Sequence, residues 1–598
     1  MDRPSRFLIT TADERTWRID HPVLCLGAWC CTYSRTATWE KLKAEIAPYH
    51  WDDRDKLYRD YLYLRELHEV LLIELSETLN SFHDTRHSHR YWRILVGPWL
   101  LYFTQMLFDR WAMIQHAVTN YKIEGTAILD FLPERVIPGD MGDFRNMYPT
   151  DAWNQAIYGR ILSDWTSVAC ERIPCNEYVA GSSAAIPADL SKHRMGLRRL
   201  LRMGISRCSQ LLNGEADAFF ISTFLPLKQD FLLQLALGQL PTINSQTPAP
   251  RAAADLGVRK LFRLNAEKHK NFEHCIRTLI PEHIPTVYLE GYRALQGTAN
   301  RLPWPKKPKV IFTSASYNAD DVFKAWASLL VESGTPLVIG QHGGNLGSAL
   351  WSSSEDHEIA IADRYLTWGW SDDNPKQYPV GALKQIGRGP GSWSPKGHML
   401  LVTSVMPRYS YVMGSFTVAA AQTDSNLDDQ YRFVRTLRKD ISENLLVRLF
   451  IPDWGWDQAD RWRDQIPDAR IDLGNGPIEP LIRGCRLYVA TYNATTFLES
   501  LSRNIPTIIF WNPKHWELRP SAEPYFNKLR EVGIYHASPE DAAAKVAEIW
   551  GDVQQWWSNP EVQEARLGFC NRFARIQENP IEKLREALIT VRPEQYNQ

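Results

Sequence analysis

Three small polar residues stand where an apolar run meets an amphipathic segment late in the sequence. The run 487–490 predicts a short buried strand, and the pattern over 495–503 predicts a helix just after it. A helix start exposes unpaired N–H groups that bind anions such as phosphate, and the polar side chains there are Asn493, Thr495 and Thr496. Glu499, one turn later, could bind a ribose hydroxyl. Simple capping of the helix by Thr explains the same pattern, so both interpretations stay open.

A glycine-rich loop, residues 341–347, forms a second cluster. It directly follows the predicted strand 336–340. Glycines let a backbone approach a ligand closely, and His342 can give a hydrogen bond or a positive charge to phosphate. The further donor-binding candidates of this region are Gln341, Gly343, Gly344, Asn345 and, at the end of the preceding predicted strand, Ser314. The alternative is a glycine turn with a structurally satisfied histidine.

Acid–base chemistry has candidates near the N-terminus. His50, Asp52 and Asp53 lie together before a predicted helix that runs to about residue 79. A carboxylate beside an imidazole can act as general base toward an acceptor hydroxyl, which gives catalytic roles to Asp52 or Asp53 with His50. Carboxylates are also favoured in the first turn of any helix, so capping is the competing interpretation.

Two more loops follow predicted strands in the last third of the chain. The first contains Ser404 and Arg408, and the second contains Asp453 and Trp454. A guanidinium can pair with phosphate or carboxylate, and an indole can stack on a base or a sugar ring. These four residues complete the predicted donor-binding set.

The elements that would position these residues alternate between strands and helices. Residues 398–555 predict a doubly wound α/β domain, preceded by a Gly-, Pro- and Ser-rich linker at 385–397. Residues 1–384 predict an N-terminal α/β domain with a helical insertion at about 39–121. A helical tail, residues 556–598, is expected to pack back on the N-terminal domain. The predicted class is therefore α/β, with two Rossmann-type domains facing a cleft.

Composition narrows the function classes. The 598 residues are 44% hydrophobic and have a formal net charge of −1, which argues against a nucleic-acid partner. No signal peptide is visible, and Arg93, Pro98 and Asp109 interrupt the most apolar stretch, 91–116. Nine cysteines without paired spacing favour a reducing, cytoplasmic location. We expect no metal site, because His83, His87 and His89 lack a fourth ligand.

Several segments together resemble one family of proteins. They are FLITTADERTW (7–17), YHWDDRDKLYRDYLYL (49–64), RYWRILVGPWL (90–100), QHGGNLG (341–347) and TTFLESLSRNIPTIIFWNP (495–513). These segments are similar in sequence to those of transferases of leptospiral type encoded in O-antigen and other surface-polysaccharide gene clusters. The two-domain pattern resembles GT-B glycosyltransferases. Many relatives carry an acidic residue where this chain has Ala28.

The glycine loop and the Thr-Thr corner are also similar to those of capsule-type transferases that use CMP-activated acidic sugars. That resemblance implies that His342, Gly343, Gly344, Thr495 and Thr496 bind the donor and that Glu499 binds its ribose. It implies a nucleotide-sugar donor, a lipid-linked or saccharide acceptor and no cofactor or metal.

Two other functions stay open on the sequence alone. One is a polyol-phosphate transferase of the CDP-glycerol type, and the other is a non-catalytic binding subunit of a polysaccharide assembly complex. Peripheral membrane contact is a further expectation, carried by the acceptor lipid and by basic runs such as 194–202.

Overall fold

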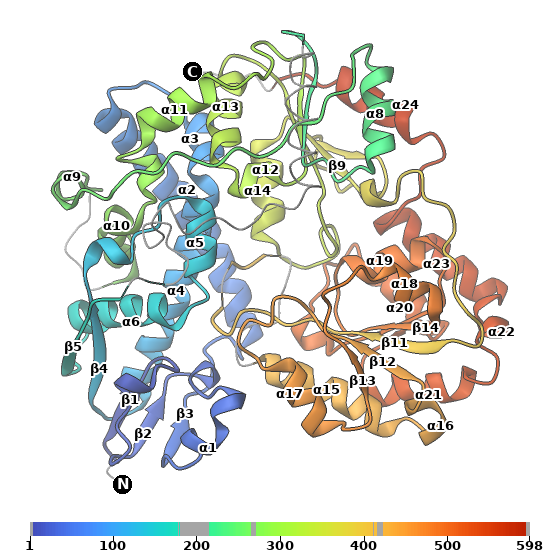
Figure 1. Ribbon diagram of the computed structural model, residues 1–598, viewed down its shortest axis with the longest axis horizontal. Helices are drawn as coiled ribbons and strands as arrows, with labels where there is room; N and C mark the ends of the chain where they lie inside the picture. The colour runs from blue at the N-terminus through green and yellow to red at the C-terminus, as the bar shows by residue number, and fades with distance from the viewer. Residues whose placement is uncertain are drawn as a thin grey trace.

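The protein, viewed as a computed structural model, forms three parallel β-sheets surrounded by helices (Figure 1). The structure describes residues 4–177, 179, 214–264, 271–410, 412–414 and 422–593. The basic run 194–202 lies outside these residues. We name the sheets N-terminal, middle and C-terminal by their order along the chain.

The N-terminal sheet has the strand order β3-β2-β1-β4-β5. Its strands are β1 (Arg6–Ile9), β2 (Val23–Cys25), β3 (Ala44–Ile46), β4 (Ile123–Phe131) and β5 (Cys170–Cys175). Short helical turns lie between and after them: η1 (Glu14–Thr16), η2 (Ala28–Cys30), η3 (Tyr33–Arg35), α1 (Thr36–Trp39) and η4 (Pro133–Arg135). Helices α5 (Met141–Met147) and α6 (Asp151–Trp165) connect β4 to β5. Strands β4 and β5 fall in a region where periodicity in the sequence was weak.

The expected helical insertion lies between β3 and β4. It consists of α2 (Arg54–His83), α3 (His89–Leu95) and α4 (Gly97–Asn120). The Asp53 side chain accepts from Lys56 N–H and so caps α2, and Ser88 caps α3 in the same way. The most apolar stretch of the sequence, 91–116, lies in two helices that meet at Val96, because Pro98 in the first turn of α4 favours a new helix start.

The middle sheet has the order β10-β9-β8-β7-β6, so its strands follow the chain without a reversal. They are β6 (Phe219–Ile221), β7 (Ile311–Thr313), β8 (Leu337–Gly340), β9 (Arg364–Thr367) and β10 (Gln377–Pro379). The helical segments of this region are α8 (Leu227–Ala236), α9 (Leu256–Leu261), α10 (Phe272–His283), η6 (Thr286–Tyr288), α11 (Tyr292–Asn300), α12 (Ser316–Ala319), α13 (Asp321–Glu332), α14 (Ser353–Ile361) and η7 (Leu383–Gln385). The expected N-terminal domain, 1–384, thus contains two sheets.

The C-terminal sheet has the order β13-β12-β11-β14-β15-β16, which is the Rossmann arrangement. Its strands are β11 (His398–Val402), β12 (Leu445–Arg448), β13 (Arg470–Asp472), β14 (Cys485–Ala490), β15 (Thr507–Phe510) and β16 (Tyr535–His536). The helical segments are α15 (Gln422–Thr436), α16 (Lys439–Ser442), α17 (Gln458–Gln465), α18 (Glu479–Gly484), α19 (Thr495–Ser502), η8 (Pro513–His515), α20 (Glu523–Glu531) and α21 (Pro539–Ile549). The predicted strand–helix–strand unit at 487–510 is confirmed, and the α/β class with Rossmann-type halves is confirmed with it.

The chain ends in helices α22 (Val553–Trp557), α23 (Pro560–Phe573) and α24 (Pro580–Ile589). The Trp557 indole donates to the Asn504 carbonyl at 3.2 Å and the Trp556 indole to the Val532 carbonyl at 3.2 Å, so both anchor on the C-terminal part. The later part of the tail contacts the middle-sheet region. Arg572 of α23 pairs with Asp372 at 2.7 Å, and on α24 Leu584 and Leu588 join the apolar cluster that contains Phe220. In the described part of the chain, no helix combines the length and the apolar character needed to cross a membrane.

Candidate functional site

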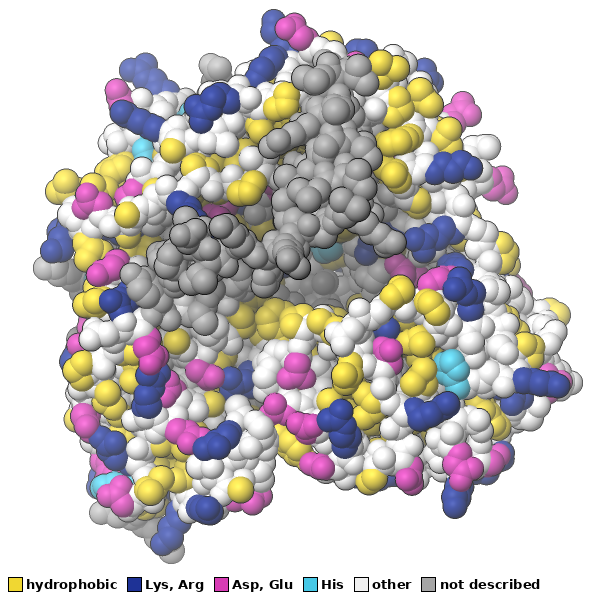
Figure 2. Space-filling view, in the orientation of Figure 1, with side chains coloured by type: hydrophobic (Ala, Val, Ile, Leu, Met, Phe, Trp, Pro, Cys, Tyr) yellow, Lys and Arg dark blue, Asp and Glu magenta, His cyan; other side chains and the backbone are white. Residues whose placement is uncertain are grey.

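The two loops singled out in the sequence lie against each other in the structure. A Cβ placed on Gly344 would lie 2.1 Å from the Ala494 carbonyl carbon and 2.2 Å from Thr495 N. A Cβ on Gly343 would lie 3.3 Å from Thr495 Oγ1. The loop after β8 of the middle sheet therefore packs directly on the start of α19, and only glycine fits at 344. In Figure 2, the surface is hollowed between the upper half of the molecule and the C-terminal part at lower right.

The start of α19 has no side-chain cap. Its N-cap residue is Ala494, in an extended conformation, and among the described residues no side chain caps the first-turn N–H groups. Thr495 and Thr496 follow inside the first turn and are half-buried, and Thr496 Oγ1 is 2.9 Å from the Tyr492 hydroxyl. The capping interpretation of these threonines is therefore wrong. Asn493 is buried at this corner, and its Oδ1 has no hydrogen-bond partner among the described residues.

His342 forms an ion pair with a carboxylate that the sequence analysis did not identify. Its Nδ1 lies 3.0 Å from Oε1 of Glu358 on α14, and its side chain keeps 33% of its surface exposed. Glu358 is fully buried and also accepts hydrogen bonds from the hydroxyls of Tyr365, at 2.8 Å, and Tyr317. Burial alone would lower the pKa of His342, but the charge and hydrogen bond of Glu358 outweigh it and raise the pKa. Glu358 therefore stabilises the imidazolium form of His342 relative to an ordinary histidine.

Gln341 holds the loop rather than facing a ligand. Its Oε1 accepts from Trp368 N at 2.8 Å and from Trp370 Nε1 at 2.9 Å, and its Nε2 donates to the Gly343 carbonyl at 2.8 Å. Ser314 is similarly occupied, since its hydroxyl donates to the Thr223 carbonyl at 3.0 Å and is fully buried. Both side chains were predicted to bind the donor, and the structure instead gives them contacts that fix the ends of β7 and β8.

The sequence did not indicate Lys384 as a site residue, because it lies next to the predicted linker and belongs to no recognisable motif. The Lys384 ammonium lies 4.7 Å from the centre of the Phe224 ring, and its charge acts on both His342 and Glu499. Burial lowers the pKa of Lys384, and Glu499 opposes that shift. Burial raises the pKa of Glu499 even though Lys384, Arg388 and Arg503 lower it. Lys384, Glu499 and His342 thus form one charged group at the junction of the two sheets.

The other predicted loops of the C-terminal sheet are used for internal contacts. Arg408 donates to Asp151 Oδ2 and to the Trp29 carbonyl, each at 2.6 Å, so it joins the C-terminal part to the N-terminal sheet. Asp453 accepts from the backbone N–H groups of Asp457 and Gln458, at 2.8 and 2.9 Å. Its neighbour Trp454 has a positive φ of 57° and packs on the core of the C-terminal sheet, and Ser404 is buried. The charged groups of Arg408 and Asp453 thus already have internal partners, and their donor-binding role stays a prediction.

The N-terminal acid–base candidates separate into three different environments. The His50 side chain is 2% exposed, with Nε2 at 3.1 Å from Asp109 Oδ1 and Nδ1 at 3.1 Å from Lys56 Nζ. Burial lowers the pKa of His50 despite Asp109. Asp53 is the N-cap of α2, so its capping interpretation is confirmed. Asp52 is exposed and accepts from Gln422 Nε2 of α15 at 3.3 Å, which places it where the N- and C-terminal parts meet. A catalytic role for buried His50 is not supported.

Metal ligation has no geometric basis in the described residues, where no group of three or more His, Cys, Asp or Glu side chains could hold an ion. The histidines of the 83–89 loop have other partners. His83 Nε2 lies 3.0 Å from the Tyr288 carbonyl, and His87 Nδ1 lies 2.7 Å from Glu332.

The sequence from residue 6 to residue 588 matches the family described as LIC12162 family transferase. The chain belongs to this family. It is therefore a transferase, as the resemblance in its motifs implied, and the match includes both the glycine loop and α19. No curated protein matches the chain significantly.

Solved structures give weaker similarities. WaaG, described as a glycosyltransferase involved in lipopolysaccharide biosynthesis, is 11% identical with a TM-score of 0.27, over 62% of this chain and 98% of its own. The spinosyn rhamnosyltransferase SpnG is 12% identical with a TM-score of 0.27, over 50% of this chain and 82% of its own. TarM is 10% identical with a TM-score of 0.31, over 47% of this chain and only 54% of its own. Similarities this low assign no activity to the LIC12162 family chain.

Proposed function

We propose that this LIC12162 family transferase is a GT-B glycosyltransferase that moves a sugar from a nucleotide donor to an acceptor. One observation carries the proposal: the His342 loop of the middle sheet lies directly on the uncapped start of α19. Phosphate binds well at a helix start that follows a parallel strand at the sheet's switch point, and α19 follows β14 at that point of the C-terminal sheet.

Charge development on the leaving nucleotide explains the arrangement. As the glycosidic bond breaks, negative charge grows on the donor phosphate, and fixed positive groups nearby lower the barrier. The first-turn N–H groups of α19 and protonated His342, held by Glu358, are such groups. They supply positive charge of the kind that a bound metal ion supplies in other transferases, and this supports our proposal of a metal-independent reaction.

We further propose a CMP-linked acidic sugar, of the nonulosonate or Kdo type, as the donor for a surface-polysaccharide or O-antigen acceptor. Support comes from the positive charges of Lys384 and Arg388, which act on Glu499 of α19. An acidic sugar adds a carboxylate that a second cation can pair with. Glu499 keeps its proposed contact with the ribose.

The acceptor hydroxyl needs a base, and Asp52 is the proposed residue. Unlike Asp53, it is not occupied by helix capping, and unlike His50 it is exposed. Asp52→Asn and Asp53→Asn form a matched pair for this point. We expect the first to reduce turnover without affecting donor binding, and the second to affect only stability.

Isothermal titration with CMP-, UDP-, GDP- and dTDP-sugars tests donor binding, and mass analysis of the product after incubation with acceptor tests the reaction. We expect sugars of one nucleotide class to bind. The variants His342→Gln and Thr495→Ala should weaken the binding of that donor. His21→Gln is the control, because His21 is a surface imidazole that also pairs with a carboxylate, Glu124, at 3.0 Å.

A product that gained a polyol phosphate would replace the glycosyl assignment with the CDP-glycerol reaction. Binding without turnover of any donor would indicate a non-catalytic subunit, and absence of all binding contradicts the proposal.

A further inference from the structure

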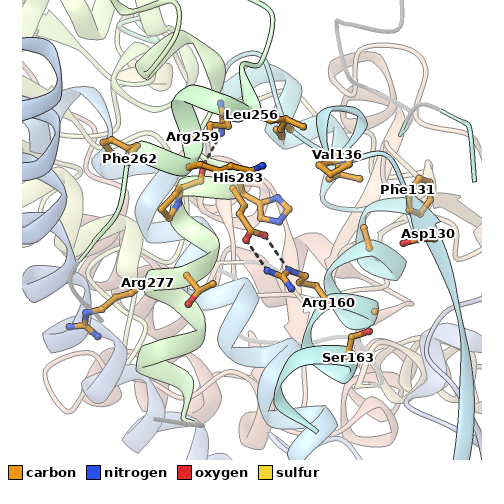
Figure 3. Close-up of a pocket in the computed structure, with 18 of the residues that line it drawn as sticks. Asp130, Phe131, Val136, Arg160, Ser163, Leu256, Arg259, Phe262, Arg277 and His283 are labelled. Atoms are coloured by element: carbon orange, nitrogen blue, oxygen red, sulfur yellow. Dashed lines mark hydrogen bonds and ion pairs between the residues drawn. The ribbon is translucent and has the colours of Figure 1, made fainter. Parts of the chain in front are cut away.

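A separate cavity of about 670 Å³ lies in the N-terminal half of the molecule (Figure 3). Strand β4 and helix α6 form one side, and helices α9 and α10 form the other. This volume lies within the range of cavities that hold drug-sized ligands. Its lining includes none of the residues of the loop after β8 or of α19, and in Figure 1 α6, α9 and α10 lie on the opposite side of the molecule from α19.

The inner wall of the cavity is mainly apolar. It is lined by Ile128, Val136, Ile137, Ala156, Phe262 and Leu264. Among the polar residues of the lining, His283 on α10 is only 5% exposed. Its ring interacts with the Val136 backbone, and its Nδ1 has no hydrogen-bond partner among the described residues. Figure 3 shows the His283 ring among the cavity residues, between Val136 and Arg259. Burial, with the charges of Arg259 and Arg160, lowers the pKa of His283 to about 3, so the ring is neutral. An unpartnered buried nitrogen of this kind is normally satisfied by a ligand or a water.

Most of the arginines around the cavity already have carboxylate partners. Arg160 pairs with Glu282 at 2.8 Å, Arg259 with Glu290 at 2.7 Å, Arg277 with Glu74 at 2.7 Å and Arg172 with Asp130 at 2.8 Å. In Figure 3, dashed lines mark the pair that Arg160 makes among the residues lining the cavity. These pairs order the walls and leave little charge for a ligand.

Two cations at the edge of the cavity differ from this group. Lys260 and Arg263 line it, are exposed, and have no carboxylate partner in the described part of the chain. Between them stands Leu261, which is 81% exposed, and Leu256 of the same helix is 37% exposed. Large apolar side chains exposed beside unpaired cations are typical of surfaces that contact amphiphiles with anionic head groups.

We propose that this cavity binds one anionic amphiphile, with its hydrocarbon chain along the Val136–Phe262 wall and its phosphate or carboxylate head group at Lys260 and Arg263. A hydroxyl or ester oxygen near the head would reach His283 Nδ1. The site lies outside the donor-binding region, so it stands or falls independently of the proposed transferase reaction.

Titration of the full-length protein with n-alkyl phosphates below their aggregation concentrations tests the proposal. Affinity should rise about fourfold for each added methylene, the gain expected for burying one CH₂ group, and should stop rising when the chain fills the cavity. Inorganic phosphate and an alkyl maltoside of the same chain length should each bind at least tenfold more weakly than the alkyl phosphate. Two results would overturn the cavity site: binding of inorganic phosphate alone, and binding of phosphatidylglycerol vesicles without binding of any monomeric amphiphile. Either result would indicate that anions are attracted only to the charged surface.

Two variants locate the ligand. Lys260→Glu with Arg263→Glu should weaken alkyl phosphate binding at least tenfold and leave alkyl maltoside binding unchanged. The control reverses the same charges elsewhere, with Lys439→Glu and Arg463→Glu, both exposed residues of the C-terminal part. Thr278→Phe should fill the cavity and reduce the affinity for both amphiphiles. If both double variants reduced the affinity for alkyl phosphate equally, the proposal would be contradicted. This comparison does not depend on whether Thr278→Phe folds.

Discussion

Two histidine–carboxylate pairs in this protein have nearly the same geometry and opposite properties. His342 lies 3.0 Å from Glu358, and His50 lies 3.1 Å from Asp109. The pKa of His342 is raised, whereas the pKa of His50 is lowered. The distance between imidazole and carboxylate therefore does not decide which histidine holds a proton.

Burial is the largest cause in both pairs and lowers both pKa values, but Glu358 outweighs it at His342, whereas Asp109 does not outweigh it at His50. The other partners of each carboxylate also differ. Asp109 also pairs with the guanidinium of Arg110 at 2.8 Å, so its charge is already compensated, and Lys56 adds a positive charge on the far side of His50. Among the described residues, Glu358 accepts hydrogen bonds from the neutral hydroxyls of Tyr317 and Tyr365, and Lys384 is the cation that lowers the pKa of His342. A charge without another cation stabilises the imidazolium, and a compensated one does so much less. The His50–Asp109 pair is buried in the core, with both side chains 2% exposed, whereas the His342 side chain of the other pair is 33% exposed.

The largest effect is expected from breaking the structural pair. Asp109→Asn leaves the Arg110 guanidinium buried, with Asn154 and Ser410 as its remaining hydrogen-bond partners. We expect the free energy of unfolding to fall by about 3–5 kcal/mol, the usual effect of removing one partner of a buried ion pair. Urea denaturation measures it. A loss below 1 kcal/mol would show that the pair does not hold this core together.

Replacing the histidine of the other pair should affect chemistry instead. His342→Gln removes the proposed donor of positive charge, and we expect turnover to fall about 100- to 1,000-fold, as for loss of one preorganised hydrogen-bond donor in a transition state. Steady-state rates with the identified donor measure it. His21→Gln should keep the parental rate, and normal turnover by His342→Gln would remove this residue from the mechanism.

The contact between the two loops should be sensitive to a single methyl group. A Cβ at Gly344 meets backbone atoms at 2.1 and 2.2 Å, so Gly344→Ala must move the loop away from α19. We expect a loss of about 1–3 kcal/mol in donor affinity, the usual effect of overpacking a tight contact. Gly343→Ala is the matched control, because its Cβ would meet only Thr495 Oγ1, at 3.3 Å. Titration calorimetry compares them, and equal affinities would show that the donor does not use this junction.

The smallest effect is a change in pH dependence. Because the folded pKa of His342 lies above its ordinary value of 6.5, its stabilising charge is complete below pH 6.5 and is lost as the pH rises through the folded pKa. Donor affinity should fall over the same range. Glu358→Gln removes the cause of the raised pKa of His342, so burial then lowers that pKa, and the fall in donor affinity should move to lower pH. An unchanged profile would mean that another group titrates.

The sequence predicted this site better than it predicted the acid–base residues. Gly344 and Thr495 stand out because glycine and small hydroxyl residues follow recognisable strands, and parallel strands carry such loops at one edge. His50 and Asp52 were grouped only because they are close in sequence. In the structure the His50 ring is buried, whereas the Asp52 carboxylate, two residues later, is exposed. Glu358 and Lys384 carry no local signal, since each acts through residues that are distant in the sequence. Strands β4 and β5 were missed for a related reason, because neighbouring strands and helices, not periodicity, define them.

By itself the sequence determined the strand–helix–strand unit at 487–510, the glycine loop at 341–347 and the α/β class, because local periodicity and turn residues encode them. Only the tertiary structure decided that Gly344 packs against Thr495 and that Glu358 raises the pKa of His342. It also decided that Arg408 and Asp453 have internal partners. Ion pairs and close backbone contacts join residues far apart in the chain, and such pairings depend on how the sheets pack rather than on spacing in the sequence.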